Sequence, residues 1–111
     1  MSERVTPLLL DDIQSAINII LEFTKGMTLE MYESDIKTKF AVERNFEILG
    51  EAAARISEDF KMSHPEIEWR ILKDFRNFII HEYFGIDNEI IWDTIQIRLP
   101  ELLISFQNLS K

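Results

Sequence analysis

The chain of 111 residues contains no cysteine, which excludes disulfide bonds and thiolate metal sites and gives no reason to expect an oxidising compartment. It also lacks an apolar run of the ~20 residues that a transmembrane helix needs. The opening residues, MSERVTPLLLDD, show neither the basic segment nor the apolar block of a signal peptide. We therefore expect a cytoplasmic protein without membrane contact. At this length, with 46% hydrophobic residues, one domain spanning residues 1–111 is expected.

Basic residues are scarce. Twelve lysines and arginines stand against twenty acidic residues, and the formal net charge is −8. Such a charge repels polyanions at long range, so we expect no DNA binding and no non-specific binding to a duplex. A role on nucleic acid would need a local positive site, or a partner that supplies one.

Glycine and proline are also rare, at three each, and they lie where helices are expected to end. Thr6 and Pro7 suit an N-cap and a first turn, and Gly26 suits a helix end. Apolar residues between them follow helical spacing. They are Leu9, Ile13, Ala16, Ile17, Ile20 and Leu21.

A long second helix is predicted from a cap at Asp35 to a stop at His64 and Pro65, because proline disfavours helical geometry in the residue before it. Its apolar positions alternate steps of four and three. They are Val42, Phe46, Leu49, Ala53, Ile56 and Phe60. Gly50, followed by three alanines, costs helix stability and permits close approach, which indicates either intimate helix packing or a subunit interface.

A third helix is expected from about Glu68 to Gly85, and a fourth begins near a cap at Asp87, with a kink or break at Pro100. A short segment around TLEMYES separates the first two helices. Short connections between four helices predict an all-α, up-and-down four-helix bundle with short extra helical segments. The charged series Arg44, Glu47, Glu51 and Arg55 shares one helix face, and a solvated surface is the preferred interpretation.

Residues 76–85 read RNFIIHEYFG and place polar side chains within an apolar helical run. On an ideal helix, Arg76 and His81 differ by about 140°, Asn77 lies about 40° from His81, and Tyr83 returns to within about 20° of Arg76. Taken alone, R-x4-H is short enough to occur by chance. Arg76 would then pair with an acid, His81 would be a satisfied residue at a helix end, and Tyr83 would pack.

The longer pattern gives that stretch more weight. Several segments in order carry a family pattern: AVERNFEILGEAAARIS, HPEIEWR, RNFIIHEYFGID, and IWDTI followed by LPELL. Over about residues 36–106, this pattern resembles the HepT-like proteins of the HEPN superfamily. The family motif R-x4-H-x-Y is intact as Arg76, His81 and Tyr83. This resemblance implies an all-helical homodimeric ribonuclease toxin, with paired motif helices lining a cleft between subunits. It also implies a minimal nucleotidyltransferase antitoxin that attaches AMP to Tyr83.

The residue types suit metal-independent RNA cleavage. His81 can act as acid or base near neutral pH. Arg76 can donate paired hydrogen bonds to phosphate oxygens and stabilise the transition state. Asn77 would orient the imidazole or contact phosphate, or else be a surface amide. The divergence of Arg76 from His81 suggests a composite site in which two chains combine their residues or gather both pairs around one cleft.

No cofactor is expected in this chain, because the antitoxin would supply the ATP and metal for AMP transfer. His64 has no second ligand at zinc spacing, and no phosphate-binding glycine motif is present. Trp69 and Trp92 are expected to pack in the core or at an interface. The alternative function is a non-catalytic helical module that binds a nucleotide or a protein partner.

Overall fold

The computed structural model describes residues 5–81 and 88–109, and within them side chains 5–77 and 88–109. In this part of the chain every regular element is helical, which confirms the predicted all-α class. The elements are α1 (Val5–Thr24), α2 (Leu29–Ser34), α3 (Ile36–Arg55), α4 (Glu58–Ser63), α5 (Trp69–His81), α6 (Asn88–Asp93), the π-helical turn η2 (Thr94–Arg98) and α7 (Leu99–Leu109).

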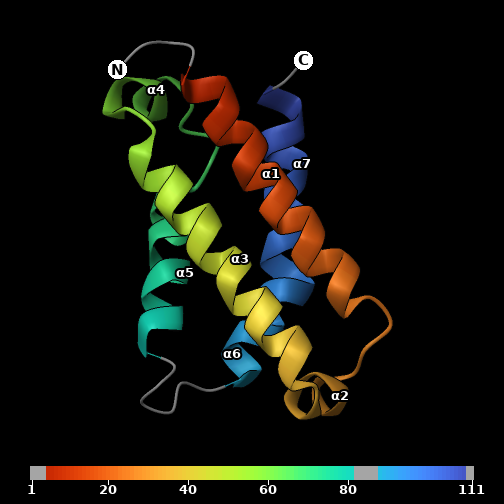
Figure 1. Cartoon of the computed structure of the whole chain (residues 1–111). Helices are drawn as coiled ribbons and strands as arrows, with labels where there is room; N and C mark the ends of the chain where they lie inside the picture. Colours follow the sequence, from red (N-terminus) through yellow and green to blue (C-terminus); the bar gives the residue numbers. More distant parts are fainter. Residues whose placement is uncertain (1–4, 82–87, 110–111) are drawn as a thin grey trace.

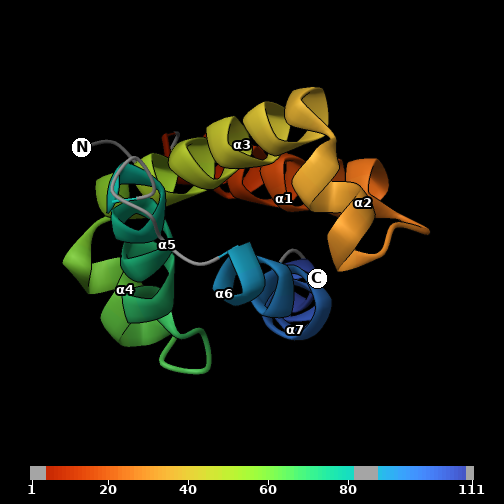
Figure 2. The same ribbon diagram turned by 90° about the horizontal axis from the view of Figure 1, so that it is seen from below.

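Four long segments alternate in direction, as the sequence predicted. Helices α1 and α3 pack side by side along their length, α5 packs on α3, and the rod formed by α6, η2 and α7 returns along α1 (Figure 1). Seen from below, α5 and the rod lie on the same side of the α1–α3 pair (Figure 2). The α5 motif helix therefore has α3 as its main neighbour.

One apolar core joins these segments. It contains the predicted α1 residues Leu9, Ile13, Ala16, Ile17 and Ile20, while Leu21 is only partly buried. From α3 it receives Val42, Phe46, Leu49, Ala52 and Ala53. The predicted apolar seam of α3 thus packs inside the chain. No helix in residues 5–81 or 88–109 has the length and apolar character to cross a membrane.

The ends of α1 only partly follow the prediction. The helix begins at Val5, so the proposed cap at Thr6 is wrong, because Thr6 already lies within the first turn. Gly26 follows the helix with a φ of 79°, a left-handed conformation that glycine adopts without a Cβ penalty. The predicted end is therefore confirmed.

Asp35 caps α3 as predicted. Its carboxylate accepts a hydrogen bond from the Thr38 backbone N–H at 3.1 Å and another from the Thr38 hydroxyl at 2.9 Å. These bonds favour the ionised form and lower the pKa of Asp35. The preceding TLEMYES segment forms α2, in which the Thr28 hydroxyl accepts from the Met31 N–H at 3.1 Å.

The predicted continuous helix from Asp35 to His64 is wrong. Helix α3 ends at Arg55, and Ile56 takes extended backbone geometry with ψ 137°. Ser57 then caps α4 by accepting from the Phe60 N–H at 3.1 Å. A serine followed by two acidic residues is a strong helix start, and here it overrides the apolar spacing that runs through Ile56 and Phe60. The predicted stop at His64 is confirmed as the end of α4.

Pro100 does not break the last rod. The helix instead widens in η2, where the Leu99 N–H bonds the Thr94 carbonyl five residues earlier. Pro100 has no N–H for the carbonyl of Gln96, which removes one ordinary helical bond. The Thr94 hydroxyl also donates to the Ile90 carbonyl at 2.8 Å. The predicted irregularity is therefore a π-helical turn, while the cap proposed at Asp87 lies outside the described residues.

Candidate active site

Helix α5 carries the first half of the R-x4-H-x-Y motif on its surface. Arg76 and Asn77 are both exposed, as residues that meet a substrate must be. His81 is the last residue of α5, and its side chain lies outside the described residues, as do Tyr83 and Gly85. The structure therefore places Arg76 and Asn77 and the backbone of His81.

Gly50 is the point where α3 meets the motif helix. A Cβ built at this position would lie 2.7 Å from the Cβ of Arg76 and 3.2 Å from the carbonyl oxygen of Leu72. Both neighbours belong to the body of α5, so no flexible side-chain end can yield. Of the two predicted roles for Gly50, the structure shows the first, intimate packing within the chain. The separation of α3 and α5 at Arg76 depends on this glycine.

Gly50→Ala is expected to push α5 away from α3 at Arg76. Overpacking of this kind costs typically 1–3 kcal/mol, and the better helix propensity of alanine offsets about 1 kcal/mol of that. We therefore expect a modest fall in Tm together with a larger fall in RNA cleavage. Circular dichroism melting and a cleavage assay measure the two effects.

Ala54→Ser is the matched control, because it adds one atom at an exposed position of α3. It should leave both the Tm and cleavage near those of the wild type. A Gly50→Ala protein that matched this control in both measurements would contradict the role given to the α3–α5 contact.

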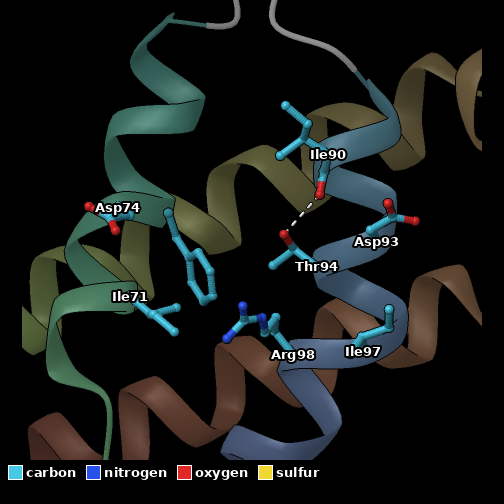
Figure 3. Close-up of a pocket in the computed structure, with 8 residues that line it drawn as sticks. Ile71, Asp74, Ile90, Asp93, Thr94, Ile97 and Arg98 are labelled. Carbon is cyan, nitrogen blue, oxygen red and sulfur yellow. Dashed lines mark hydrogen bonds between the residues drawn. The ribbon is translucent and has the colours of Figure 1, made fainter.

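A cleft of about 340 Å³ opens between α5 and the rod of α6 and η2. It is lined by Ile71, Asp74, Phe75, Ile90, Asp93, Thr94, Ile97 and Arg98. Figure 3 shows the Arg98 side chain lying between the two helices, with Ile71 facing it from α5. This cleft was not predicted from the sequence, because the widened turn that places Thr94 and Arg98 there depends on a bonding pattern that apolar spacing does not show.

Aromatic and ionic contacts join the start of α5 to the last rod. The Trp69 and Phe106 rings lie 5.6 Å apart, edge to face. Beside them, Arg98 and Glu68 form an exposed ion pair at 3.6 Å. Arg98 thus belongs both to this ion pair and to the lining of the cleft.

The motif residues lie on two different faces of α5, only one of which borders this cleft. Seven residues separate Asp74 from position 81, which places the two within about 20° around the helix, whereas Arg76 lies about 160° from Asp74. Arg76 is thus on the α3 side, and neither it nor Asn77 is among the described lining residues. One chain does not bring Arg76 and the backbone position of His81 to one face.

The remaining polar candidates have structural roles. Arg44 pairs with Glu47 at 3.3 Å on an exposed face, and Glu51 and Arg55 are exposed as well, which confirms the predicted solvated surface. Glu66 lies 3.2 Å from the Nδ1 of His64. The pKa of Glu66 is lowered mainly by a hydrogen bond with its own backbone, and to a smaller extent by the hydrogen bond with His64. In the described side chains, no three His, Asp or Glu residues gather closely enough to hold a metal.

Both tryptophans pack, as expected. The Trp69 indole donates to the His64 carbonyl at 3.0 Å, in addition to its contact with Phe106. Trp92 stacks against Tyr32 with ring centroids 5.4 Å apart. Both are partly buried against the core.

Comparison with known proteins gives a consistent result. The family model described as ribonuclease HepT-like matches residues 13–109. A protein of Thermococcus cleftensis named "Probable ribonuclease HepT" is 45% identical over 102 residues, covering 92% of this chain and 93% of that protein. A protein of Methanocaldococcus jannaschii, named as a candidate RNase, is 34% identical over 111 residues, or 100% of this chain and 92% of its own length. No solved structure gives a significant match.

Proposed function

Because the chain belongs to the ribonuclease HepT-like family, we propose that it is an endoribonuclease toxin whose active site combines residues of two copies of the chain. The observation that carries the composite site is the placement of Arg76. It is exposed on the α3 side of α5, turned away from the face that holds position 81. A second copy related by a two-fold axis can bring the missing group to each Arg76.

The proposed chemistry uses groups of the protein alone. Arg76 binds the scissile phosphate and stabilises the charge of its pentacoordinate transition state through paired N–H donors. His81 takes the proton from the ribose 2′-OH or protonates the leaving 5′-oxygen. Asn77, exposed one turn before His81, orients the imidazole or contacts the phosphate. No metal ion takes part in this scheme.

A homodimer is part of this proposal, and it does not rest on the surface of α3. The apolar seam of α3 and the small residues Gly50, Ala52 and Ala53 are buried within the chain, so they do not call for a partner. Two other features do. They are the divergence of the motif around α5 and the exposure of Ile90 and Ile97 in the cleft wall, at 47% and 58%.

Regulation by a minimal nucleotidyltransferase antitoxin completes the proposal. The antitoxin would attach AMP to Tyr83, and the chain itself needs no cofactor for this step. Support comes from the intact motif and the family match, since Tyr83 itself lies outside the described residues.

Two observations favour the alternative, a non-catalytic binding module. The cleft between α5 and the rod is large enough for a small ligand, and the net charge of −8 opposes RNA binding at long range. In that case the family fold would bind a nucleotide or a protein without cutting RNA.

Purified protein incubated with total RNA in the presence of EDTA tests the proposal. We expect cleavage to persist, because the proposed groups are an arginine and a histidine. Sedimentation of the same sample should show a dimer at micromolar concentration. Intact RNA after incubation without EDTA would favour the binding module, whereas an active monomer would contradict the composite site.

A further inference from the structure

The motif helix is positively charged in an acidic protein. Helix α5 carries Arg70, Lys73 and Arg76 against a single carboxylate, Asp74, which gives a charge of +2 in a chain with a formal charge of −8. For comparison, α1 contains three acidic residues and no basic ones. The local positive site that a role on nucleic acid requires therefore coincides with the helix that carries the motif.

Two of these cations share the outward face of α5 with Asn77. Counted around an ideal helix, Arg70 and Asn77 lie about 20° apart, and Lys73 lies about 40° from Asn77. All three are exposed. Along the axis they extend about 10.5 Å, which spans roughly three nucleotides of a stacked strand. We call Arg70 and Lys73 the α5 cation strip.

The two acidic residues just before α5 contact other side chains. Glu66 contacts His64 at 3.2 Å, and Glu68 contacts Arg98 at 3.6 Å on the cleft side. Asp74 lines the cleft and lies about 40° from Arg70 on an ideal helix, so it is the one acidic residue of α5 next to the strip. Within the described residues, neither member of the strip takes part in an ion pair, so both guanidinium and ammonium groups are available to an anion.

We propose that the α5 cation strip binds the backbone phosphates of a single-stranded RNA segment next to the scissile phosphate. This inference rests on the proposed ribonuclease function and adds the path of the substrate. Lys73 is one turn before Asn77, and Arg70 is nearly one turn further, so phosphates held there would lead the strand directly to the motif. A single strand fits better than a duplex, because two exposed cations cannot offset the repulsion between a duplex and the remaining acidic surface.

The strip acts in binding, so its loss should raise KM and leave kcat near that of the wild type. Arg70→Gln and Lys73→Gln each remove one charge while keeping a long polar side chain. Lys37→Gln and Arg55→Gln are the matched controls, since they remove the same charge from exposed positions of α3. Cleavage of a labelled single-stranded RNA at increasing concentration gives the two constants.

The salt dependence of RNA binding distinguishes phosphate contacts made by the strip from a general effect of the protein's net charge. Binding of the same RNA is measured by fluorescence anisotropy at several KCl concentrations, with every variant in an inactive His81→Ala background. Each strip variant should weaken binding several-fold and reduce the slope of log K against log[KCl] by about 0.7, whereas the α3 controls should retain the parent slope.

Equal slopes and affinities for strip variants and α3 controls would overturn this inference even if the wild type cleaves RNA. A fall in kcat without a rise in KM would also contradict it. If the wild type cleaves no RNA but the strip variants still lose binding selectively, then the proposed ribonuclease function fails and the binding site stands.

Discussion

Arg76→Ala and His81→Ala are each expected to reduce RNA cleavage by roughly 10²–10⁴-fold, the range observed when a positioned charge donor or a general acid–base group is removed. Arg76 is exposed, and the contact of α5 with Gly50 involves its Cβ, which alanine retains. Helical content and dimerisation should therefore be unchanged, as circular dichroism and sedimentation would show.

Arg44→Ala is the matched control for Arg76→Ala. Arg44 is also an exposed helical arginine, and it pairs at 3.3 Å with Glu47 on the solvated face of α3. Its removal should leave cleavage within about twofold of the wild type, because an exposed pair of this kind contributes less than ~1 kcal/mol. Unfolding of either motif variant would instead support a structural role for the motif.

Mixing the two inactive variants tests whether the site is shared between chains. In a heterodimer of Arg76→Ala and His81→Ala subunits, one composite site loses both groups and the other retains both. If subunits exchange freely, half of the dimers are mixed, so activity should return to about a quarter of the wild-type value. Continued inactivity, with subunit exchange verified, would show that Arg76 and His81 act within one chain.

Tyr83→Phe is expected to retain RNA cleavage and to escape silencing by the antitoxin. Upon co-expression with the antitoxin, the wild type should lose its activity, whereas the variant should keep it. From helical spacing, Tyr83 is expected within about 20° of Arg76. An AMP group attached there would bring its phosphate to the arginine, occupy its donors and exclude the substrate phosphate. Phenylalanine keeps the ring but offers no oxygen for attachment.

Mass spectrometry after co-expression with a nucleotidyltransferase encoded beside this chain measures the modification. The peptide that contains Tyr83 should carry AMP, and the adduct should be absent from Tyr83→Phe. Tyr32, the other of the two tyrosines, serves as an internal control because its side chain is fully buried. AMP on other residues alone, or a Tyr83→Phe protein still silenced by AMP transfer, would contradict this assignment.

The sequence predicted the helical segments well where apolar spacing and a terminating residue agreed. Helix α1 and Gly26 are such a case, as is the Asp35 cap of α3. The prediction failed where two local preferences competed. Apolar spacing favoured one helix through Ile56, whereas Ser57 and the acidic residues after it favoured a new start, and the latter determined the fold.

The candidate site shows a similar division. The motif residues were identified through the resemblance of the longer sequence pattern to the HepT-like family, because the R-x4-H spacing alone is short enough to occur by chance. The approach of α3 at Gly50 was predicted only as one of two possibilities, since a sequence does not state which surface a small residue faces. The cleft beside Arg98 was missed, because it depends on how far α5 stands from a rod that begins seven residues later in the chain, at Asn88.

The contact at Gly50 also separates selection for the fold from selection for activity. The atoms that a side chain at position 50 would meet are the Cβ of residue 76 and the carbonyl oxygen of residue 72, and every amino acid except glycine supplies the former. The requirement for glycine is therefore independent of whether residue 76 is an arginine. A related protein that had lost the proposed catalytic arginine would still be under pressure to keep a glycine at this position. Glycine at 50 thus marks the helix spacing of the fold, whereas arginine at 76 marks the proposed active site.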